Sequence, residues 1–304
     1  MKTKTVATTQ SIVTERGHYP TDSVASQDGV NLGYHQIGHG PGLVLVQGAM
    51  GSAQNFRQLA EALADAFTVY VPDRRGRGLS PLPYSKNYTI QRDVEDLDAR
   101  LAKTDAHFVF GLSSGGIICL QAARTLPSIK KAAVFEPALF INGLPTALLS
   151  RFTKEMAQGK VAAALVTAMK AAQMGSPIFS VLPNWLMVQM TKMMLSHEDK
   201  KGSGGYVPMM ELAPALQYDF QVVAEMSDKL ESFSGIQTEV LLLGGSKSPA
   251  YLRVALDALE RVLPHATHIE FPGLDHGAAW NYDKQRNPGG KPERVAQELH
   301  RFFG

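Results

Sequence analysis

The sequence predicts an α/β protein built on a doubly wound, mostly parallel sheet. Short apolar runs alternate with amphipathic helical segments along most of the chain, and turn residues separate them. Several of the apolar runs, such as LVLV at 43–46, are unbroken, which suits strands that helices cover on both faces. With 304 residues, the chain is long enough for one large domain or two small ones, and it can bury a sizeable core.

The first half of the chain contains these elements in order. Strands are expected within 22–46, including VNLGYHQI at 30–37, and then at 67–73, 107–111 and 132–137. Helices are expected at 53–66, 88–103 and 114–124, because their apolar residues recur at helical spacing. Helical spacing is clearest in the first two, with Phe56, Leu59, Ala60 and Leu63 in one and Ile90, Val94, Leu97 and Leu101 in the other.

The alternation stops near residue 138 and resumes near 234. The stretch between is mostly helical and has no convincing strand. After it come a strand at 238–245, a helix over 249–263, a strand at 267–272 and a last helix over 292–303, which Pro292 can begin. We therefore expect three parts: a polar N-terminal arm (1–21), an α/β core (22–137 and 234–304) and an inserted helical segment (138–233).

Composition and charge restrict the kinds of partner. A formal net charge of +2 gives no basis for binding nucleic acid or an anionic membrane, and no run is apolar enough to span a bilayer. The single cysteine, Cys119, excludes an intrachain disulfide, and the first residues lack the apolar region of a secretory signal. We expect a cytoplasmic monomer or homodimer. The histidines are scattered rather than at metal-ligand spacing, and no glycine run matches a phosphate-binding loop. We therefore expect neither a metal nor a cofactor.

One motif carries chemistry. Gly111-Leu112-Ser113-Ser114-Gly115 has the pattern G-x-S-x-G, and it stands between an apolar strand and an apolar helix. In this context the serine sits on a strained strand-to-helix turn that raises its hydroxyl above the sheet. The two glycines leave room for that turn, and the N-terminus of the following helix directs N–H groups at the reacting centre.

With this motif and four others in order, the chain resembles the α/β-hydrolase family over nearly its whole length. LVLVQGAMGS resembles the family's oxyanion loop, VPDRRGRGLS resembles its turn after the fourth strand, the inserted segment lies where the family carries its cap, and FPGLDHG places His276 after the last strand. The resemblance implies a serine hydrolase with Ser113 as nucleophile and His276 as base. The Ser114 N–H would be one oxyanion donor. The other would be Ala49 by position, with Met50 as the alternative.

The acid of the triad is not where the family commonly has it. The strand VLLLGG runs into Ser246, Lys247 and Ser248 without a carboxylate. Glu136 ends the strand after the nucleophile helix, which reaches the same edge of a parallel sheet as Ser113. Pancreatic lipases and zearalenone-type lactonases in the family place the acid there, and the lactonases use a Glu. The alternatives are Asp275, Asp257 and a site without a carboxylate.

Two further features remain. Asp73 stands in an arginine-rich turn, which we interpret as structural rather than as a phosphate site. All methionines but Met1 and Met50 fall within 156–226, and such side chains line adaptable apolar surfaces or fill a small core. The candidate pocket residues are Phe179, Trp185, Met187, Met190 and Trp280.

The expected function is cofactor-free hydrolysis of a carboxylic ester or lactone of an apolar small molecule. C–C bond hydrolysis, acyl transfer and peracid formation use the same three residues in this family. A non-catalytic ligand receptor on the fold is the alternative from another class.

Overall fold

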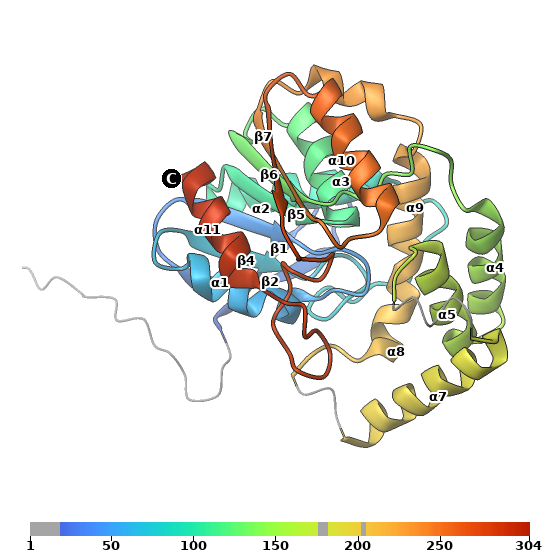
Figure 1. The fold of residues 1–304 in the computed structure, drawn as a ribbon. Coiled ribbons are helices and arrows are strands. Elements are labelled where there is room, and N and C mark those ends of the chain that lie inside the picture. Colours follow the sequence, from blue (N-terminus) through green and yellow to red (C-terminus); the bar gives the residue numbers. More distant parts are fainter. Residues whose placement is uncertain (1–18, 176–181, 202–204) are drawn as a thin grey trace, which may run out of the picture.

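A mixed eight-stranded sheet forms the centre of the molecule. The computed structural model describes residues 19–175, 182–201 and 205–304, and Figure 1 shows its fold. The strand order is β1-β2-β4-β3-β5-β6-β7-β8. The pairs β1–β2 and β2–β4 are antiparallel and the others are parallel, which confirms the predicted sheet. The strands are β1 (Thr21–Ala25), β2 (Asn31–Gly38), β3 (Gly42–Val46), β4 (Thr68–Pro72), β5 (Phe108–Leu112), β6 (Lys131–Phe135), β7 (Glu239–Gly245) and β8 (Ala266–Phe271).

Helices cover both faces of this sheet. The short turn η1 (Ala53–Phe56), α1 (Arg57–Leu63) and α11 (Pro292–Phe303) lie on one face, and α2 (Ile90–Thr104), α3 (Ser114–Thr125) and α10 (Ala250–Val262) lie on the other. Successive strand residues point to opposite faces. In β6, for example, Val134 belongs to the apolar cluster that includes residues of α2, α3 and α10. Phe135 belongs to the cluster on the opposite face, which includes residues of α1 and α11. Burial on both faces explains why the central strands are unbroken apolar runs in the sequence.

In its described residues, the segment between β6 and β7 consists of helices joined by loops and contains no strand. Figure 1 shows its helices gathered to one side of the core. They are α4 (Thr146–Ala157), α5 (Val161–Ala171), α7 (Asn184–Lys201), α8 (Met209–Leu212), η2 (Ala213–Ala215), α9 (Leu216–Met226) and η3 (Leu230–Gly235). All of these helices except η3 contribute to a third apolar cluster that contains Phe152 and Leu165, and Ala49 and Met50 of the loop after β3 pack on it. The inserted segment therefore contacts the predicted oxyanion loop.

The ends of the predicted parts can be compared with these elements. The predicted last helix coincides with α11, and β1 begins at Thr21, the last residue assigned to the arm. Residues 1–18 lie outside the described residues. The division into arm, core and cap stays a prediction. None of the described helices is both long and apolar enough to cross a bilayer.

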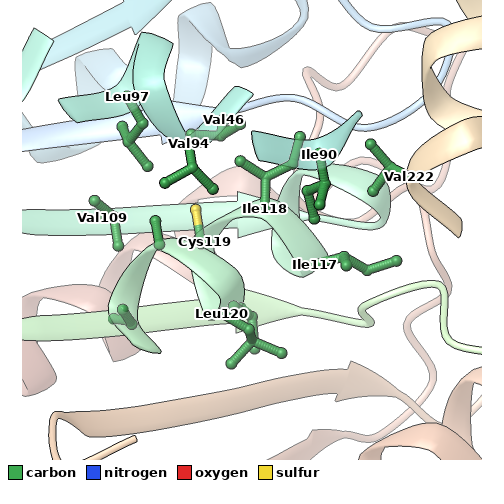
Figure 2. Packing of buried hydrophobic residues seen from close by; sticks show 14 of the residues in the cluster. Val46, Ile90, Val94, Leu97, Val109, Ile117, Ile118, Cys119, Leu120 and Val222 are labelled. Carbon is green, nitrogen blue, oxygen red and sulfur yellow. The ribbon is translucent and has the colours of Figure 1, made fainter. Parts of the chain in front are cut away.

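Cys119 gives a direct test of the packing around α3. Its side chain is fully buried, and Figure 2 shows it among Val94, Val109 and Ile118. Burial raises the pKa of its thiol, so the reactive thiolate is suppressed at neutral and mildly alkaline pH. We expect native protein at about pH 8 to leave 5,5′-dithiobis(2-nitrobenzoate) unreacted, whereas denatured protein releases one equivalent of the coloured thiolate. Rapid stoichiometric reaction of the native protein would contradict this packing.

Candidate active site

The register of three strands brings three chain positions together at the carboxyl edge of the sheet. Leu112 of β5 pairs with Phe135 of β6, which pairs with Leu243 of β7. The next residues continue this pairing, because the Ser113 N–H donates to the Phe135 carbonyl and the Glu136 N–H donates to the Leu243 carbonyl, both at 2.9 Å. Ser113 and Glu136 therefore lie side by side, with the end of β7 beyond Glu136.

Ser113 occupies the strained turn that its motif predicts. Its φ is 58°, in the left-handed region that L-residues rarely adopt, and α3 begins at the next residue. A Cβ added at Gly111 would lie 2.4 Å from the Gly115 carbonyl oxygen, and one at Gly115 would lie 2.3 Å from the Val46 carbonyl oxygen. Only glycine fits at both positions, so the two glycines of the motif allow α3 to begin in direct contact with the ends of β3 and β5.

The loop after β3 runs directly past the candidate nucleophile. A Cβ at Gly48 would lie 2.7 Å from the Ser113 Cβ, so only glycine allows this approach. The Gly51 N–H closes a turn onto the Gly48 carbonyl at 3.3 Å, and Met50 in that turn has φ 55°. Within the described chain, the N–H groups of Ala49, Met50 and Ser114 have no hydrogen-bond acceptor. They are free to serve as donors to a ligand.

Glu136 and His276 form a hydrogen-bonded pair. His276 Nδ1 lies 2.6 Å from Glu136 Oε2, and the Gly245 N–H donates to Glu136 Oε1 at 2.6 Å. The Glu136 side chain is fully buried, and its φ of 47° is again left-handed. Because a carboxylate only accepts hydrogen bonds, Nδ1 carries the imidazole proton in this pair. The lone pair of neutral His276 is then on Nε2, where a base needs it.

The end of β7 supports this pair although it has no carboxylate. A Cβ at Gly245 would lie 2.3 Å from the Leu274 carbonyl oxygen, so the glycine allows the histidine loop to lie against the strand. The Lys247 N–H then donates to that same carbonyl at 2.9 Å, and Ser246 Oγ accepts from the Gly273 N–H at 2.8 Å. β7 therefore contributes a backbone donor to Glu136 and holds the loop that carries His276.

The other two candidate acids lie elsewhere. Asp275 is exposed, and its Oδ1 accepts from the Gly277 N–H at 3.0 Å, which shapes the loop. Asp257 is on the exposed side of α10, where its carboxylate lies within 4.8 Å of ligand atoms of Glu260 and His268. His268 already bonds Glu260 at 2.9 Å. Among the described residues, only Glu136 forms a hydrogen bond with the His276 side chain.

The arginine-rich turn is built from buried ion pairs. Asp73 accepts from the Ala53 N–H at 2.7 Å and from the Leu79 N–H at 2.9 Å, as the structural interpretation expects. The three guanidinium groups are buried and each faces carboxylates: Arg74 faces Asp93 and Asp219, Arg75 faces Asp28 and Asp96, and Arg77 faces Asp219. They are thus already paired and leave no open cationic site for a phosphate.

The candidate pocket residues do not form one group. Met187 is buried in the inserted segment, but Trp185 and Met190 are 68% and 46% exposed on α7, so the described structure encloses neither. Phe179 lies outside the described residues. Trp280 is half-buried, and a Cβ at Gly51 would lie 3.3 Å from its Cζ2, which places it beside the oxyanion loop.

Comparison with known proteins agrees with this fold. The sequence model of the Alpha/beta hydrolase family matches residues 43–298, which is most of the chain. The chain belongs to the alpha/beta hydrolase family. A crystal structure of an alpha/beta hydrolase from Sphaerobacter thermophilus DSM 20745 is 30% identical, with a TM-score of 0.72 over 93% of this chain and 100% of that chain.

Two curated relatives and one further structure are also similar to the chain. The "Uncharacterized hydrolase YraK" of Bacillus subtilis (strain 168) is 38% identical over 96 residues, 31% of this chain and 35% of that protein. The "Pimeloyl-[acyl-carrier protein] methyl ester esterase" of Stenotrophomonas maltophilia (strain K279a) is 32% identical over 127 residues, 40% of this chain and 48% of that protein. The chain therefore spans less than half the length of each. A thermophilic esterase from Thermogutta terrifontis (malate bound) shares the fold at 20% identity, with a TM-score of 0.65 over 93% and 98% of the two chains.

Two residues that contact this site were not singled out from the sequence. Arg77 donates to two carbonyls of the oxyanion loop, and Asp219 of α9 bonds the Ser114 hydroxyl. The arginine-rich turn was a signal for Arg77, but we interpreted it only through Asp73. Asp219 has no local signal, because its partners lie more than a hundred residues earlier in the chain.

Proposed function

We propose that this alpha/beta hydrolase is a cofactor-free serine hydrolase that cleaves a carboxylic ester or lactone of an apolar small molecule. The observation that carries the proposal is the hydrogen-bonded pair of His276 and the buried Glu136 at the same sheet edge as the strained Ser113 turn. A serine hydroxyl needs an adjacent base to become a nucleophile, and the base needs a partner that fixes its tautomer.

The first half of the reaction forms an acyl-enzyme. His276 Nε2 takes the Ser113 hydroxyl proton while Oγ attacks the substrate carbonyl carbon, which becomes tetrahedral. The negative charge on the former carbonyl oxygen is held by the Ser114 N–H and by that of Ala49, with Met50 as the alternative donor. The intermediate collapses, the carbon–oxygen bond to the leaving group breaks, and His276 returns the proton to the leaving alcohol.

The second half repeats these steps with water. His276 deprotonates the water, which attacks the acyl carbon, and the proton passes to Ser113 Oγ as the carboxylic acid leaves. For a lactone, the alcohol and the acid remain on one molecule. Glu136 stays ionised throughout and stabilises the imidazolium, and its burial strengthens that interaction because little water screens it.

The nature of the substrate follows from the surroundings of the oxyanion loop. Ala49 and Met50 pack on the apolar cluster of the inserted segment, so a bound carbonyl group would lie beneath apolar side chains. We propose that the inserted segment acts as a cap that supplies the apolar part of the substrate site. An esterase among the relatives favours esters, and a Glu acid after β6, as in zearalenone-type lactonases, favours lactones.

A substrate panel tests this function. We expect the protein to hydrolyse p-nitrophenyl esters of apolar acids or aromatic lactones, releasing the carboxylic acid without added metal or cofactor. When deacylation is the slower step, p-nitrophenol appears in a burst of one equivalent per enzyme molecule. A well-folded protein that hydrolyses no ester and no lactone across a panel of short, long and aromatic acyl groups would contradict the proposal.

A further inference from the structure

Arg77 binds the backbone of the oxyanion loop, which is the loop after β3 at residues 47–51. Its side chain is buried, and its Nη1 donates to the Gly48 carbonyl at 2.8 Å and to the Gly51 carbonyl at 3.1 Å. Nη2 pairs with Asp219 Oδ2 at 2.5 Å. One guanidinium group therefore holds both ends of the turn that contains Ala49 and Met50. The proposed hydrolytic reaction does not use this group directly.

The planarity of the peptide gives this contact a consequence for the site. The Gly48 carbonyl and the Ala49 N–H belong to one trans peptide, so they point in opposite directions in one plane. A cation that fixes the carbonyl also fixes the direction of the Ala49 N–H. It also polarises the peptide, because hydrogen bonds in a chain strengthen one another. A charged donor on the carbonyl thus makes the Ala49 N–H a better oxyanion donor.

Asp219 extends the same network to the second donor. It lies on α9, in the inserted segment, and is 1% exposed. Its Oδ1 accepts from the Ser114 hydroxyl at 2.6 Å and from Arg74 at 2.7 Å, while Oδ2 pairs with Arg77. Burial disfavours the charged carboxylate, but Arg77 and Arg74 still hold the pKa of Asp219 below its ordinary value.

We propose that Arg77 and Asp219 are positioning residues that hold the two oxyanion donors, Ala49 and Ser114, in the geometry of the transition state. Through Asp219, the inserted segment takes part in building the oxyanion hole as well as in covering the substrate. This inference rests on the proposed hydrolase function and deepens it. Its effect belongs to the tetrahedral state, because the donors are aimed at the position of the oxyanion rather than at bound substrate.

The same turn contains a matched control. Arg75 is buried to the same degree as its neighbours and pairs with Asp96 at 2.6 Å and Asp28 at 2.7 Å. Its side-chain hydrogen bonds go to Asp96, Asp28 and Ser26, and none goes to the loop at 47–51 in the described structure. Arg75 therefore reports what the loss of a buried arginine in this turn does to the fold alone.

The test compares Arg77→Lys with Arg75→Lys in the full chain. Lysine keeps the charge but loses the planar fork that reaches two carbonyls and a carboxylate at once. We expect Arg77→Lys to lower kcat by about 10- to 100-fold while KM changes by less than about 3-fold. The pH midpoint of kcat/KM should stay unchanged, because the Glu136–His276 pair is untouched. Arg75→Lys should keep kcat within about 3-fold, even where both variants lower Tm.

A second variant keeps the test decisive if Arg77→Lys does not fold. Asp219→Asn preserves the acceptor for Ser114 but removes the charge that holds Arg77, and we expect the same fall in kcat at unchanged KM. Equal kcat in the folded Arg77 or Asp219 variants and the Arg75 variant would overturn the inference while leaving the hydrolase function intact. A wild-type protein without ester or lactone turnover would overturn the function, and the inference with it.

Discussion

Replacing Ser113 with alanine is expected to lower kcat by about 10⁴-fold or more. The variant loses the only atom that can form the proposed acyl-enzyme, while the Ala side chain still fits the strained turn because serine already holds φ 58° there. Residual turnover would come from the oxyanion donors acting on direct attack by water. The measurement is steady-state turnover of the best ester or lactone in the panel, with Tm as the check on folding.

Ser246→Ala is the control for this variant. Ser246 follows β7 at the same edge of the sheet, and its hydroxyl accepts only the Gly273 N–H among the described contacts. We expect its kcat to stay within about 3-fold of wild type, since the loss concerns one loop hydrogen bond. If Ser113→Ala retained turnover comparable to that of Ser246→Ala, Ser113 would not be the nucleophile.

Glu136→Gln is expected to lower kcat by about 10³- to 10⁴-fold with little change in fold. The Gly245 N–H requires an acceptor, so it selects the oxygen of the Gln amide. The amide NH₂ must then face His276 Nδ1. Because the NH₂ group only donates hydrogen bonds, Nδ1 has to accept one and cannot carry a proton. The imidazole proton moves to Nε2, and the ring can no longer take the Ser113 proton. The substitution therefore locks the wrong tautomer and also removes the charge that stabilises the imidazolium.

Asp275→Asn is the control for Glu136→Gln, because it also removes a negative charge near His276 but leaves the Glu136–His276 hydrogen bond in place. Asp275 precedes His276, and an asparagine oxygen can still accept the Gly277 N–H that the aspartate binds. We expect kcat within about 3-fold of wild type for this variant. The measurement is kcat for both variants across a range of pH. A large loss in Asp275→Asn together with wild-type kcat in Glu136→Gln would move the acid to Asp275.

Local sequence patterns were sufficient for the fold. Unbroken apolar strands and amphipathic helices have distinct periods, so the order of elements and the last helix at Pro292–Phe303 could be predicted. The G-x-S-x-G motif predicted a strained turn at Ser113, because the steric exclusion at Gly111 acts within a few residues, whereas the contact of Gly115 with Val46 of β3 needs the folded sheet. The expectation that Glu136 reaches the same edge as Ser113 depended only on parallel pairing of neighbouring strands, and the register bears out that placement.

Contacts between residues that are far apart in the sequence could not be predicted from such local patterns. Arg77 and Asp219 are 142 residues apart, and a charged residue on a helix ordinarily indicates a solvated face. Only the docking of α9 against the nucleophile helix buries Asp219 and pairs it. Trp185 and Met190 are a second case: we interpreted their apolar side chains as pocket residues, and α7 leaves both exposed in the described structure. Apolar character alone does not tell which neighbour, if any, covers a helix face.

Covalent labelling with a fluorophosphonate, followed by mass spectrometry of the digested protein, shows whether Ser113 is an activated nucleophile. The probe reacts with a serine only where a base activates it and donors hold the phosphonyl oxygen. We expect a single adduct on the peptide that contains Ser113, formed in wild-type protein and nearly lost in His276→Ala. A folded wild-type protein that stays unlabelled, or that carries its adduct on another residue, would contradict the claim that Ser113, His276 and Glu136 form one catalytic site.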